Sequence, residues 1–352
     1  YLDLLEEAGE QLMGSEQNAA LARLNAEAGN LRLAWQQAIA DGALERARRV
    51  LPAWTLYHEM AGRRREALHA LQPAVAAARA AGAGERADPA ARGLLAFLLA
   101  AQKHFGLGVI AFAQVRAARQ ESLALARTLP DGLDKAFALL LDCSGSPTEA
   151  EEAQALLAEC LAIFRALDHR WGMAMAQLIW ADSLNMGSHD CRHARAMYQA
   201  SRTMFTALEN RWGEALCLWG LASVATQEGR CAEAIALAQE CLAIYQALGD
   251  SWRISVALDS LAEAMVAGGD LAGARRHYER SLAYLREMGQ RVAIAFAVRR
   301  LGDLAQRLGD LPAARAYFGE CLALCRETGE VETAAAVAER LRALDEDTGG
   351  RV

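Results

Sequence analysis

A motif repeated at a fixed interval constrains the fold of this chain more than any other feature. Similar six-residue motifs begin at Ala207, Ala247 and Glu287, which are forty residues apart. A fourth copy begins at Ala166, forty-one residues before Ala207. This period is typical of a solenoid, in which each repeat is a helix pair that buries its apolar face by stacking on its neighbours. One continuous array can therefore account for all 352 residues.

The composition favours helices in every repeat. Alanine is abundant, β-branched residues are sparse, and there are only six prolines. Such a sequence has high helix propensity and little tendency to form strands. We therefore expect an all-α protein without a sheet, folded as a right-handed superhelical solenoid of antiparallel helix pairs.

Alignment of the units shows which residues hold the pairs together. In the second helix, a small residue is followed by a mostly aromatic position and then by another small residue, which allows close helix contact. These positions are Ala194, Ala234, Ala274 and Ala314; Tyr198, Ala238, Tyr278 and Phe318; and Ser201, Cys241, Ser281 and Cys321. The turns within the pairs contain Gly229, Gly269 and Gly309, each able to end a helix in the left-handed conformation.

One unit shows this pattern almost completely, with Leu301-Gly302 in its first helix, Gly309-Asp310 in its turn, and Ala314, Phe318 and Cys321 in its second helix. The pattern resembles the tetratricopeptide repeat. The units here are longer than the usual length of about 34 residues, so each helix is expected to gain about one turn. The resemblance is specific over residues 171–327 and weaker over 43–167.

The chain divides into four regions. Residues 1–42 are linker helices, 43–167 are divergent helix pairs, 168–344 are regular units with a final capping helix, and 345–352 are a frayed tail. In the linker we expect one helix over 1–13 and a second that starts at a Ser15 cap and runs to about Ala40, with a close contact or a bend at Gly29-Asn30. Helix pairs are expected over 43–81, 89–129 and 133–167, and the Gly/Pro-rich loop 82–89 is expected to be an internal hinge or an exposed site of proteolysis.

The linker carries a second resemblance. Its motifs are Tyr1-Leu2, Gly14-x-Glu16-Gln17, Leu21-Ala-Arg-Leu24, Gly29-Asn30-Leu31-Arg32 and Trp35. They resemble the segment that joins the nucleotide-binding part of STAND-type bacterial ATPases to their repeats, as in AfsR-like and LuxR-type transcriptional regulators; Gly29 stands where these relatives carry an acidic residue. The resemblance implies that the repeats sense an inducer and control an upstream nucleotide-binding domain. The chain begins with Tyr inside a helical pattern, so we expect a longer protein.

Charge and cysteine content exclude several classes of function. The net charge is −7, so the body as a whole has no electrostatic reason to bind nucleic acid or an anionic membrane. Charged or polar residues interrupt every apolar run that could span a bilayer. The eight cysteines form neither CxxC pairs nor a disulfide framework, which indicates a reducing, cytoplasmic location.

No catalytic motif is recognisable, so we predict a protein without enzymatic activity and without a cofactor. The segment His189-Asp190-Cys191-Arg192-His193 could bind a transition metal, but its spacing fits no zinc pattern; the alternative is a polar turn in which Asp190 caps the next helix. Cys321 and Cys325 lie one helical turn apart and are expected to be buried, unreactive thiols. Trp171, Trp212 and Trp252 are expected to pack between repeats rather than stack on a ligand.

We place the candidate ligand site on the concave face, which first helices line in tetratricopeptide arrays. Each first helix of the regular units contains a large apolar residue followed by a small one, as in Leu301-Gly302. Counting from this pair gives the outward positions Leu178, Asp182, Trp219, Ser223, Asp259, Glu263, Arg299, Arg300 and Asp303. Trp219 is the informative member, because a large ring is costly to leave in water without a partner. The carboxylates could meet a cationic group, and the two arginines a carboxylate. The alternative is an ordinary solvated face with one stray tryptophan.

The leading hypothesis is therefore a sensor domain of a STAND-type ATPase or transcriptional regulator. Its partners would be a peptide, a protein or a small-molecule inducer, together with the nucleotide-binding domain of the same polypeptide, but not nucleic acid or a membrane. The alternative is a constitutive scaffold that joins two proteins and has no switch. An enzyme of unrecognised type is a third hypothesis.

Overall fold

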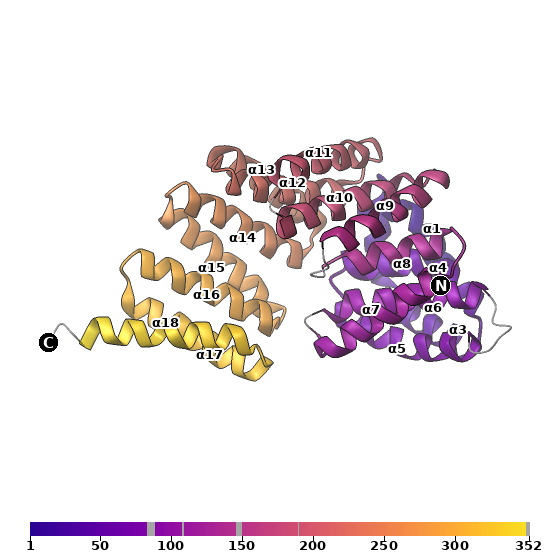
Figure 1. Ribbon diagram of the computed structural model, residues 1–352, viewed down its shortest axis with the longest axis horizontal. Coiled ribbons are helices and arrows are strands. Elements are labelled where there is room, and N and C mark those ends of the chain that lie inside the picture. Colours follow the sequence, from indigo (N-terminus) through magenta and orange to yellow (C-terminus); the bar gives the residue numbers. More distant parts are fainter. Residues whose placement is uncertain (83–88, 108, 146–149, 189, 350–352) are drawn as a thin grey trace. The chain divides into compact units, whose positions relative to one another are not determined.

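The computed structural model describes residues 1–82, 89–107, 109–145, 150–188 and 190–349 (Figure 1). These residues form helices and turns, and none of them lies in a β-strand, as the sequence predicts. The chain divides into two compact units, Tyr1–Gly220 and Leu221–Val352, with the boundary inside the helix α12 (Arg211–Gln227). Each unit is an all-α stack of helix pairs.

The first unit contains the linker helices and four helix pairs. Its elements are α1 (Leu2–Leu12), α2 (Gln17–Ala26), α3 (Ala28–Ala40), α4 (Leu44–Met60), α5 (Arg64–Ala81), α6 (Pro89–Gly106), α7 (Phe112–Ala126), α8 (Leu133–Cys143), α9 (Ala150–Ala166), α10 (Arg170–Ser183), the π-helical turn η1 (Leu184–Ser188) and α11 (Cys191–Ala207). The linker is not a separate arm, because α1 packs along α4.

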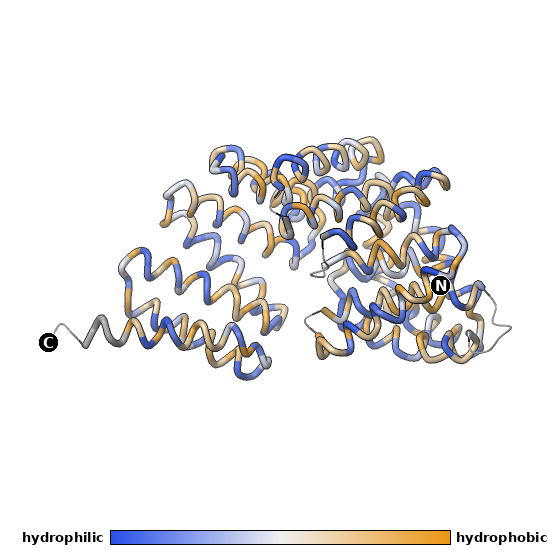
Figure 2. The backbone as a smooth tube through the Cα atoms, in the orientation of Figure 1, coloured by the Kyte–Doolittle hydropathy of each residue, from blue (hydrophilic) through white to orange (hydrophobic). Residues whose placement is uncertain are grey.

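The second unit is a regular stack, visible in Figure 1 as successive antiparallel helices that end in yellow. Its elements are α13 (Cys231–Leu248), α14 (Ser251–Ala267), α15 (Leu271–Glu287), α16 (Arg291–Arg307), α17 (Leu311–Thr328) and α18 (Val331–Gly349). Each of these helices packs against the next from α13 to α18. In the hydropathy-coloured tube the helices carry both apolar and polar positions, as expected for helices that bury one side in a stack (Figure 2).

Glycines and aspartates set the turns, as the sequence predicts. Gly229, Gly269 and Gly309 have φ of 71°, 86° and 76°, the left-handed conformation that glycine adopts without steric cost. The second helix then begins after an aspartate in two of these units: Asp270 and Asp310 accept hydrogen bonds from backbone N–H groups three residues later. These short-range signals fix the helix ends of the pairs.

Close contact between helices depends on rings that lie directly over glycines. A Cβ atom added at Gly172 would lie 2.5 Å from the ring of Phe164, and one at Gly213 would lie 2.4 Å from the ring of Phe205. Both rings are fully buried. In each case the ring belongs to a second helix and the glycine to the first helix of the next unit, so the contact is made between neighbouring repeats.

Three details of the linker and the repeats differ from the sequence-based expectations. The expected second helix is two helices, α2 and α3, which meet at Glu27 and not at Gly29-Asn30. Ser15 does not cap α2, because Glu16 is the N-cap residue and no side chain makes the capping hydrogen bond. The forty-one-residue unit contains the π-helical turn η1 just before the loop to α11, where one extra residue is accommodated in a wider turn.

At the C-terminus, α18 continues to Gly349, so the prediction of a frayed tail from residue 345 is wrong for 345–349. The possible hinge loop at 82–89 lies almost entirely outside the described residues, as do residues 350–352.

The ring-on-glycine contacts make a prediction about stability. Gly213→Ala should destabilise the fold by about 1–3 kcal/mol, because the new methyl group would overlap the buried ring of Phe205. In an open helix position the same change stabilises by up to about 1 kcal/mol. Gly319 in α17 is the matched control, because nothing lies within 4 Å of an added Cβ atom there. The midpoint of urea denaturation should fall for Gly213→Ala and rise for Gly319→Ala. A higher midpoint for Gly213→Ala would contradict the close contact.

Candidate functional site

The predicted ligand face is divided between the two units. Leu178 and Asp182 lie on α10 and Trp219 lies on the first half of α12, all in the first unit. The other members lie on α12, α14 and α16 in the second unit; they are Ser223, Asp259, Glu263, Arg299, Arg300 and Asp303.

In the first unit the predicted site residues differ in exposure and in hydrogen-bond partners. Leu178 is only 4% exposed, so its expected outward position is wrong: the side chain packs in the core. Asp182 is half-buried and accepts a hydrogen bond of 2.6 Å from the hydroxyl of Tyr198, so its carboxylate already has a partner. Trp219 is partly exposed, which leaves it as the member of this group whose apolar surface could meet a ligand.

In the second unit a partly buried ion network joins two first helices. Arg300 of α16 donates to Asp259 of α14, with 2.5 Å between Nη1 and Oδ2, and its Nη2 lies 3.0 Å from Oε1 of Glu263. Burial raises the pKa of Asp259 to about 6, although the positive charge of Arg300 acts in the opposite direction. The network carries one more negative than positive charge when both carboxylates are ionised.

The remaining charged residues of this part differ in their partners. Asp303 forms an ion pair with Arg340 of α18. Arg299 has no hydrogen-bond or ion-pair partner among the described residues, and its guanidinium lies 5.8 Å from the ring centroid of Phe296. The expected pair of arginines for a carboxylate is therefore reduced to Arg299, because Arg300 is already neutralised within the chain.

The candidate metal and thiol sites have structural explanations. Asp190 caps α11 by accepting from the backbone N–H of His193 at 3.2 Å, which confirms the predicted cap, whereas His189 lies outside the described residues. No group of three or more metal-binding side chains gathers in the described part of the chain. Cys321 and Cys325 are buried, as predicted, and burial raises the pKa of the Cys321 thiol to about 12, which keeps it protonated and unreactive.

The tryptophan column also packs as predicted in its first two members. Trp171 and Trp212 are buried in the first unit, and Trp252 of the second unit packs partly exposed against the core cluster around α14–α18.

A buried polar contact that the sequence did not indicate joins the linker to the start of α12. Two hydrogen bonds meet at the carbonyl oxygen of Leu12, the last residue of α1: one from Nε2 of Gln17 at 2.8 Å and one from Nδ2 of Asn210 at 3.3 Å. Oε1 of Gln17 accepts from the backbone N–H of Trp212 at 3.1 Å, and Oδ1 of Asn210 accepts from that of Gly213 at 2.7 Å. We call these four hydrogen bonds the linker clasp.

The linker clasp satisfies groups that helices leave unpaired at both ends. The Leu12 carbonyl belongs to the C-terminus of α1, and the N–H groups of Trp212 and Gly213 belong to the first turn of α12. Gln17 is 2% exposed and Asn210 is 0% exposed, so the network is closed to solvent. All of it lies within the first unit, between segments about 195 residues apart in the sequence.

The chemistry of Asn210 explains why an amide stands at this cap. The corresponding cap of the next pair is Asp250, a carboxylate that accepts from the N–H of Arg253. A carboxylate is acceptor-only, so it could cap α12 but could not donate to Leu12. Asn210 does both, so it caps α12 and also bonds to the linker.

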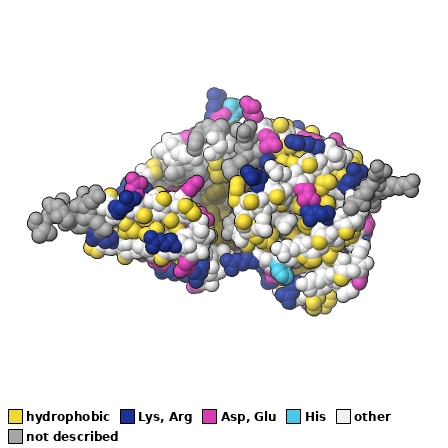
Figure 3. All heavy atoms as spheres, turned by 60° about the horizontal axis from the view of Figure 1, so that its bottom comes forward, with side chains coloured by type: hydrophobic (Ala, Val, Ile, Leu, Met, Phe, Trp, Pro, Cys, Tyr) yellow, Lys and Arg dark blue, Asp and Glu magenta, His cyan; other side chains and the backbone are white. Residues whose placement is uncertain are grey.

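The charged side chains are mixed on the one face that Figure 3 shows. On the face shown in Figure 3, Lys and Arg side chains lie next to Asp and Glu side chains, with hydrophobic atoms between them. Within the described residues, no helix combines the length and the apolar character that crossing a bilayer requires.

Comparisons with known proteins agree with this geometry. Residues 214–287 match the family model of the tetratricopeptide repeat. The chain carries tetratricopeptide repeats. No curated protein matches it.

Three solved structures share the tetratricopeptide-repeat fold at low sequence identity. The STAND (signal transduction ATPase with numerous domains) protein with a tetratricopeptide repeat sensor from Pyrococcus horikoshii matches with TM-score 0.63 and 15% identity; the match covers 95% of this chain and 50% of that protein, so the chain spans half of its length. A Rap protein complexed with competence and sporulation factor matches with TM-score 0.52 and 12% identity, over 93% of this chain and 100% of that one. Aspartyl phosphate phosphatase F from Bacillus subtilis matches with TM-score 0.54 and 11% identity, over 88% and 77%.

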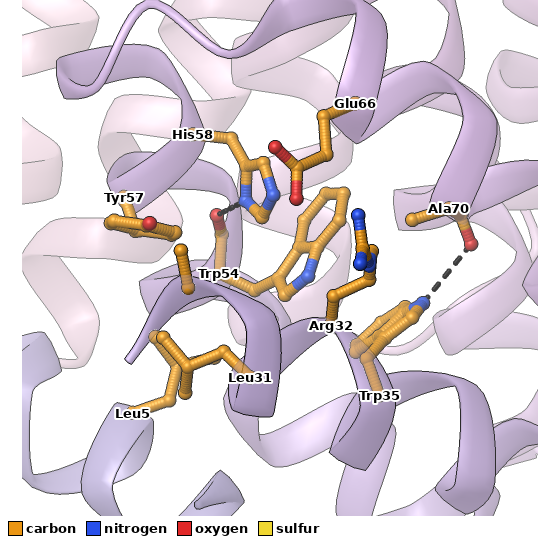
Figure 4. Close-up of a pocket in the computed structure, with 10 residues that line it drawn as sticks. Leu5, Leu31, Arg32, Trp35, Trp54, Tyr57, His58, Glu66 and Ala70 are labelled. Carbon is orange, nitrogen blue, oxygen red and sulfur yellow. Dashed lines mark hydrogen bonds between the residues drawn. The ribbon is translucent and has the colours of Figure 1, made fainter. Parts of the chain in front are cut away.

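The joint between the linker and the first tetratricopeptide-like pair contains an aromatic pocket (Figure 4). Trp35 of α3 stacks on Trp54 of α4 with 4.9 Å between ring centroids and donates from Nε1 to the carbonyl oxygen of Ala70 at 3.0 Å. The pocket leaves about 10 Å³ for the centre of a water molecule, which is enough for one water. It therefore joins two parts of the fold and leaves no space for a ligand.

His58 in this pocket predicts a pH dependence of stability. Burial lowers the pKa of His58 to about 4, while Nδ1 donates to the carbonyl oxygen of Trp54 at 2.8 Å; Glu66 raises and Arg63 lowers the pKa by smaller amounts. Between pH 6.5 and 4 this imidazole is protonated in the unfolded chain but neutral in the folded chain. The free energy of unfolding therefore falls as the pH decreases from 6.5 to 4.

The His58→Asn variant should remove this part of the pH dependence, about 3 kcal/mol between pH 6.5 and 4 at 1.36 kcal/mol per pKa unit. The amide nitrogen of Asn keeps a donor for Trp54 but does not titrate. Urea denaturation at a series of pH values gives the free energy of unfolding of the wild type and of the variant. The effect is the difference between the two slopes of this free energy against pH. Equal slopes would mean that His58 is hydrated in the folded protein.

Proposed function

We propose that this chain is the sensor domain of a larger STAND-type signalling ATPase or transcriptional regulator, located in the cytoplasm. It acts by binding a peptide or protein partner, or a small-molecule inducer, and not by catalysis. Binding changes the state of the linker helices at residues 1–42 and thereby controls a nucleotide-binding domain of the same polypeptide. The fold of the STAND protein with a tetratricopeptide sensor supports the class, and the peptide-complexed Rap structure supports the kind of ligand.

The linker clasp is the observation that carries this proposal. A sensor must be coupled physically to the segment that it controls, whereas a constitutive scaffold requires no such contact. Here the linker is hydrogen-bonded to the start of α12 through two fully buried amides. Removing one partner of such a network leaves the others buried and unpaired, at a cost of about 1–3 kcal/mol. That energy is of the size by which an effector couples two sites.

The ligand contact closest to the clasp is Trp219. It lies on α12 seven residues after Trp212, whose N–H belongs to the clasp, and this corresponds to about 10 Å along a helix. A ligand that packs on the partly exposed ring of Trp219 would act on the same rigid helix. It can shift the linker only if it binds the clasped and released states with different affinities.

The second unit offers a charged contact for the same class of ligand. Arg299 has no carboxylate partner among the described residues, so it suits a carboxylate of a peptide or protein. Asp259, Glu263 and Arg300 neutralise one another in part. These residues would supply specificity for a ligand that binds the second unit.

The clasp predicts the effect of one substitution. Asn210→Asp keeps the acceptor for Gly213 but replaces the donor to Leu12 with a carboxylate, which repels that carbonyl oxygen. Amides of α1 and α2 should then exchange with deuterium roughly ten times faster, since 1.4 kcal/mol corresponds to a factor of ten. Hydrogen-exchange mass spectrometry of this chain measures the change peptide by peptide.

Asp250→Asn is the matched control, since it exchanges the same two groups at the equivalent cap and does not touch the linker. It should leave exchange in α1 and α2 unchanged. If Asn210→Asp also left it unchanged, the linker would not be held by the clasp, and the constitutive scaffold would become the better proposal. In the full-length protein, the clasp variant should raise ATPase activity without inducer.

The ligand face predicts the outcome of a screen. Peptides with an apolar residue that bind the first unit and raise the melting temperature of the wild type should lose at least half of that shift in Trp219→Ala. Peptides with a free carboxylate that bind the second unit should lose at least half of theirs in Arg299→Gln. Differential scanning fluorimetry measures the shift, and Gln306→Ala, an exposed position on α16, serves as the control. Hits with the same shift in every variant would place the ligand elsewhere and remove these residues from the site.

A further inference from the structure

A groove in the first unit has no role in the proposed function. It lies between α5 and α7, which both pack on α6, and it encloses a volume of about 440 Å³. That volume is within the range of small-ligand sites, about 300–1,000 Å³. Its apolar lining is Val75, Ala76, Leu99, Ile110, Ala117 and Ala118. None of these helices carries a member of the predicted ligand face.

Three glutamine side chains line this groove from three different helices. Gln72 lies on α5, Gln102 on α6 and Gln114 on α7. None of the three makes a side-chain hydrogen bond within the described part of the chain. A primary amide offers two donors and one acceptor, so the groove presents six donors and three acceptors without a protein partner.

The charges at the groove are cancelled within the protein. Arg79 of α5 and Glu121 of α7 form a bidentate pair, with Nε to Oε1 at 3.0 Å and Nη2 to Oε2 at 2.6 Å. Glu121 raises the pKa of Arg79, as expected for a hydrogen-bonded ion pair. The pair spans the groove between the two helices. A charged ligand would therefore find no unpaired charge of opposite sign in its lining.

We propose that this groove binds an uncharged, extended polypeptide segment that carries an aliphatic side chain. A peptide group has one donor and one acceptor, so it complements a primary amide in both directions, and successive peptide groups recur every 3.2–3.4 Å in an extended chain. Three amides on three helices can pair with several of them. The apolar lining then receives the side chain between the amides.

The end of the groove extends the apolar surface available to such a segment. Ile110 lines the groove at the turn before α7, and the next exposed apolar side chains are Val109 and Phe112, at 39% and 66% exposed. Large apolar side chains at this exposure are stabilised when a partner covers them. A segment bound along the glutamines would continue over this turn.

A capped amino acid tests the proposal directly. N-acetyl-leucine N′-methylamide contains two peptide groups, one aliphatic side chain and no charge. In ¹H–¹⁵N spectra of the whole chain, it should shift the side-chain amide signals of Gln72, Gln102 and Gln114 in a saturable manner, with a dissociation constant in the millimolar range. N-acetyl-leucine, which keeps a free carboxylate, should bind at least threefold more weakly, because no cation of the groove is free to receive it.

Two substitutions separate the groove from the rest of the surface. Gln102→Leu, in the middle of the lining, should weaken binding of the capped leucine at least fivefold while the backbone spectrum remains that of a folded chain. Gln120→Leu, on the same helix as Gln114 but outside the lining, should leave binding unchanged. The absence of saturable shifts, equal binding to Gln102→Leu, or tighter binding of the carboxylate would each overturn the proposal. None of these results depends on the linker clasp or on Trp219.

Discussion

The contact on which the rest of this structure depends is a buried ring placed directly over a glycine of the next repeat. Phe164 over Gly172 and Phe205 over Gly213 bring the second helix of one pair against the first helix of the following pair at a distance that no Cβ atom would permit. The Phe205–Gly213 contact lies in the first turn of α12. The backbone N–H of Trp212 in the same turn donates to Gln17, so the linker is held at this turn of the repeats.

Most of the fold could be predicted from the sequence because the signals that specify it are local and repeated. The left-handed glycine at 269 or 309 ends one helix, and the aspartate directly after it begins the next, all within a few residues. The same residues recur in consecutive units, so each unit supports the prediction made for the other. One repeat has one residue more than the others, and the sequence showed where this residue lies but not which structure contains it. The π-helical turn η1 accommodates it.

The candidate site was less predictable, for two physical reasons. Position counting assigns a side chain to a face but not its burial, so Leu178 was placed outward although neighbouring helices cover it. Position counting also does not show which side chains pair with one another. Arg300 was expected to bind a ligand, but it forms ion pairs with Asp259 and Glu263. The linker clasp was beyond prediction, since the place of Asn210 in the repeated motif indicates a helix cap but not a partner in the linker, and Gln17 lies about 195 residues away in the sequence.

In the proposed sensor, the clasp also sets how strong a signal is needed. If releasing the linker costs about 1–3 kcal/mol, a ligand must prefer the released state by about 5–150-fold to offset that cost. Burying the partly exposed ring of Trp219 is a contact of that size, because burying an aromatic side chain contributes up to about 3 kcal/mol. On this proposal a carboxylate in place of Asn210 would release the linker without any ligand, so the amide at this cap would make the state of the linker depend on binding.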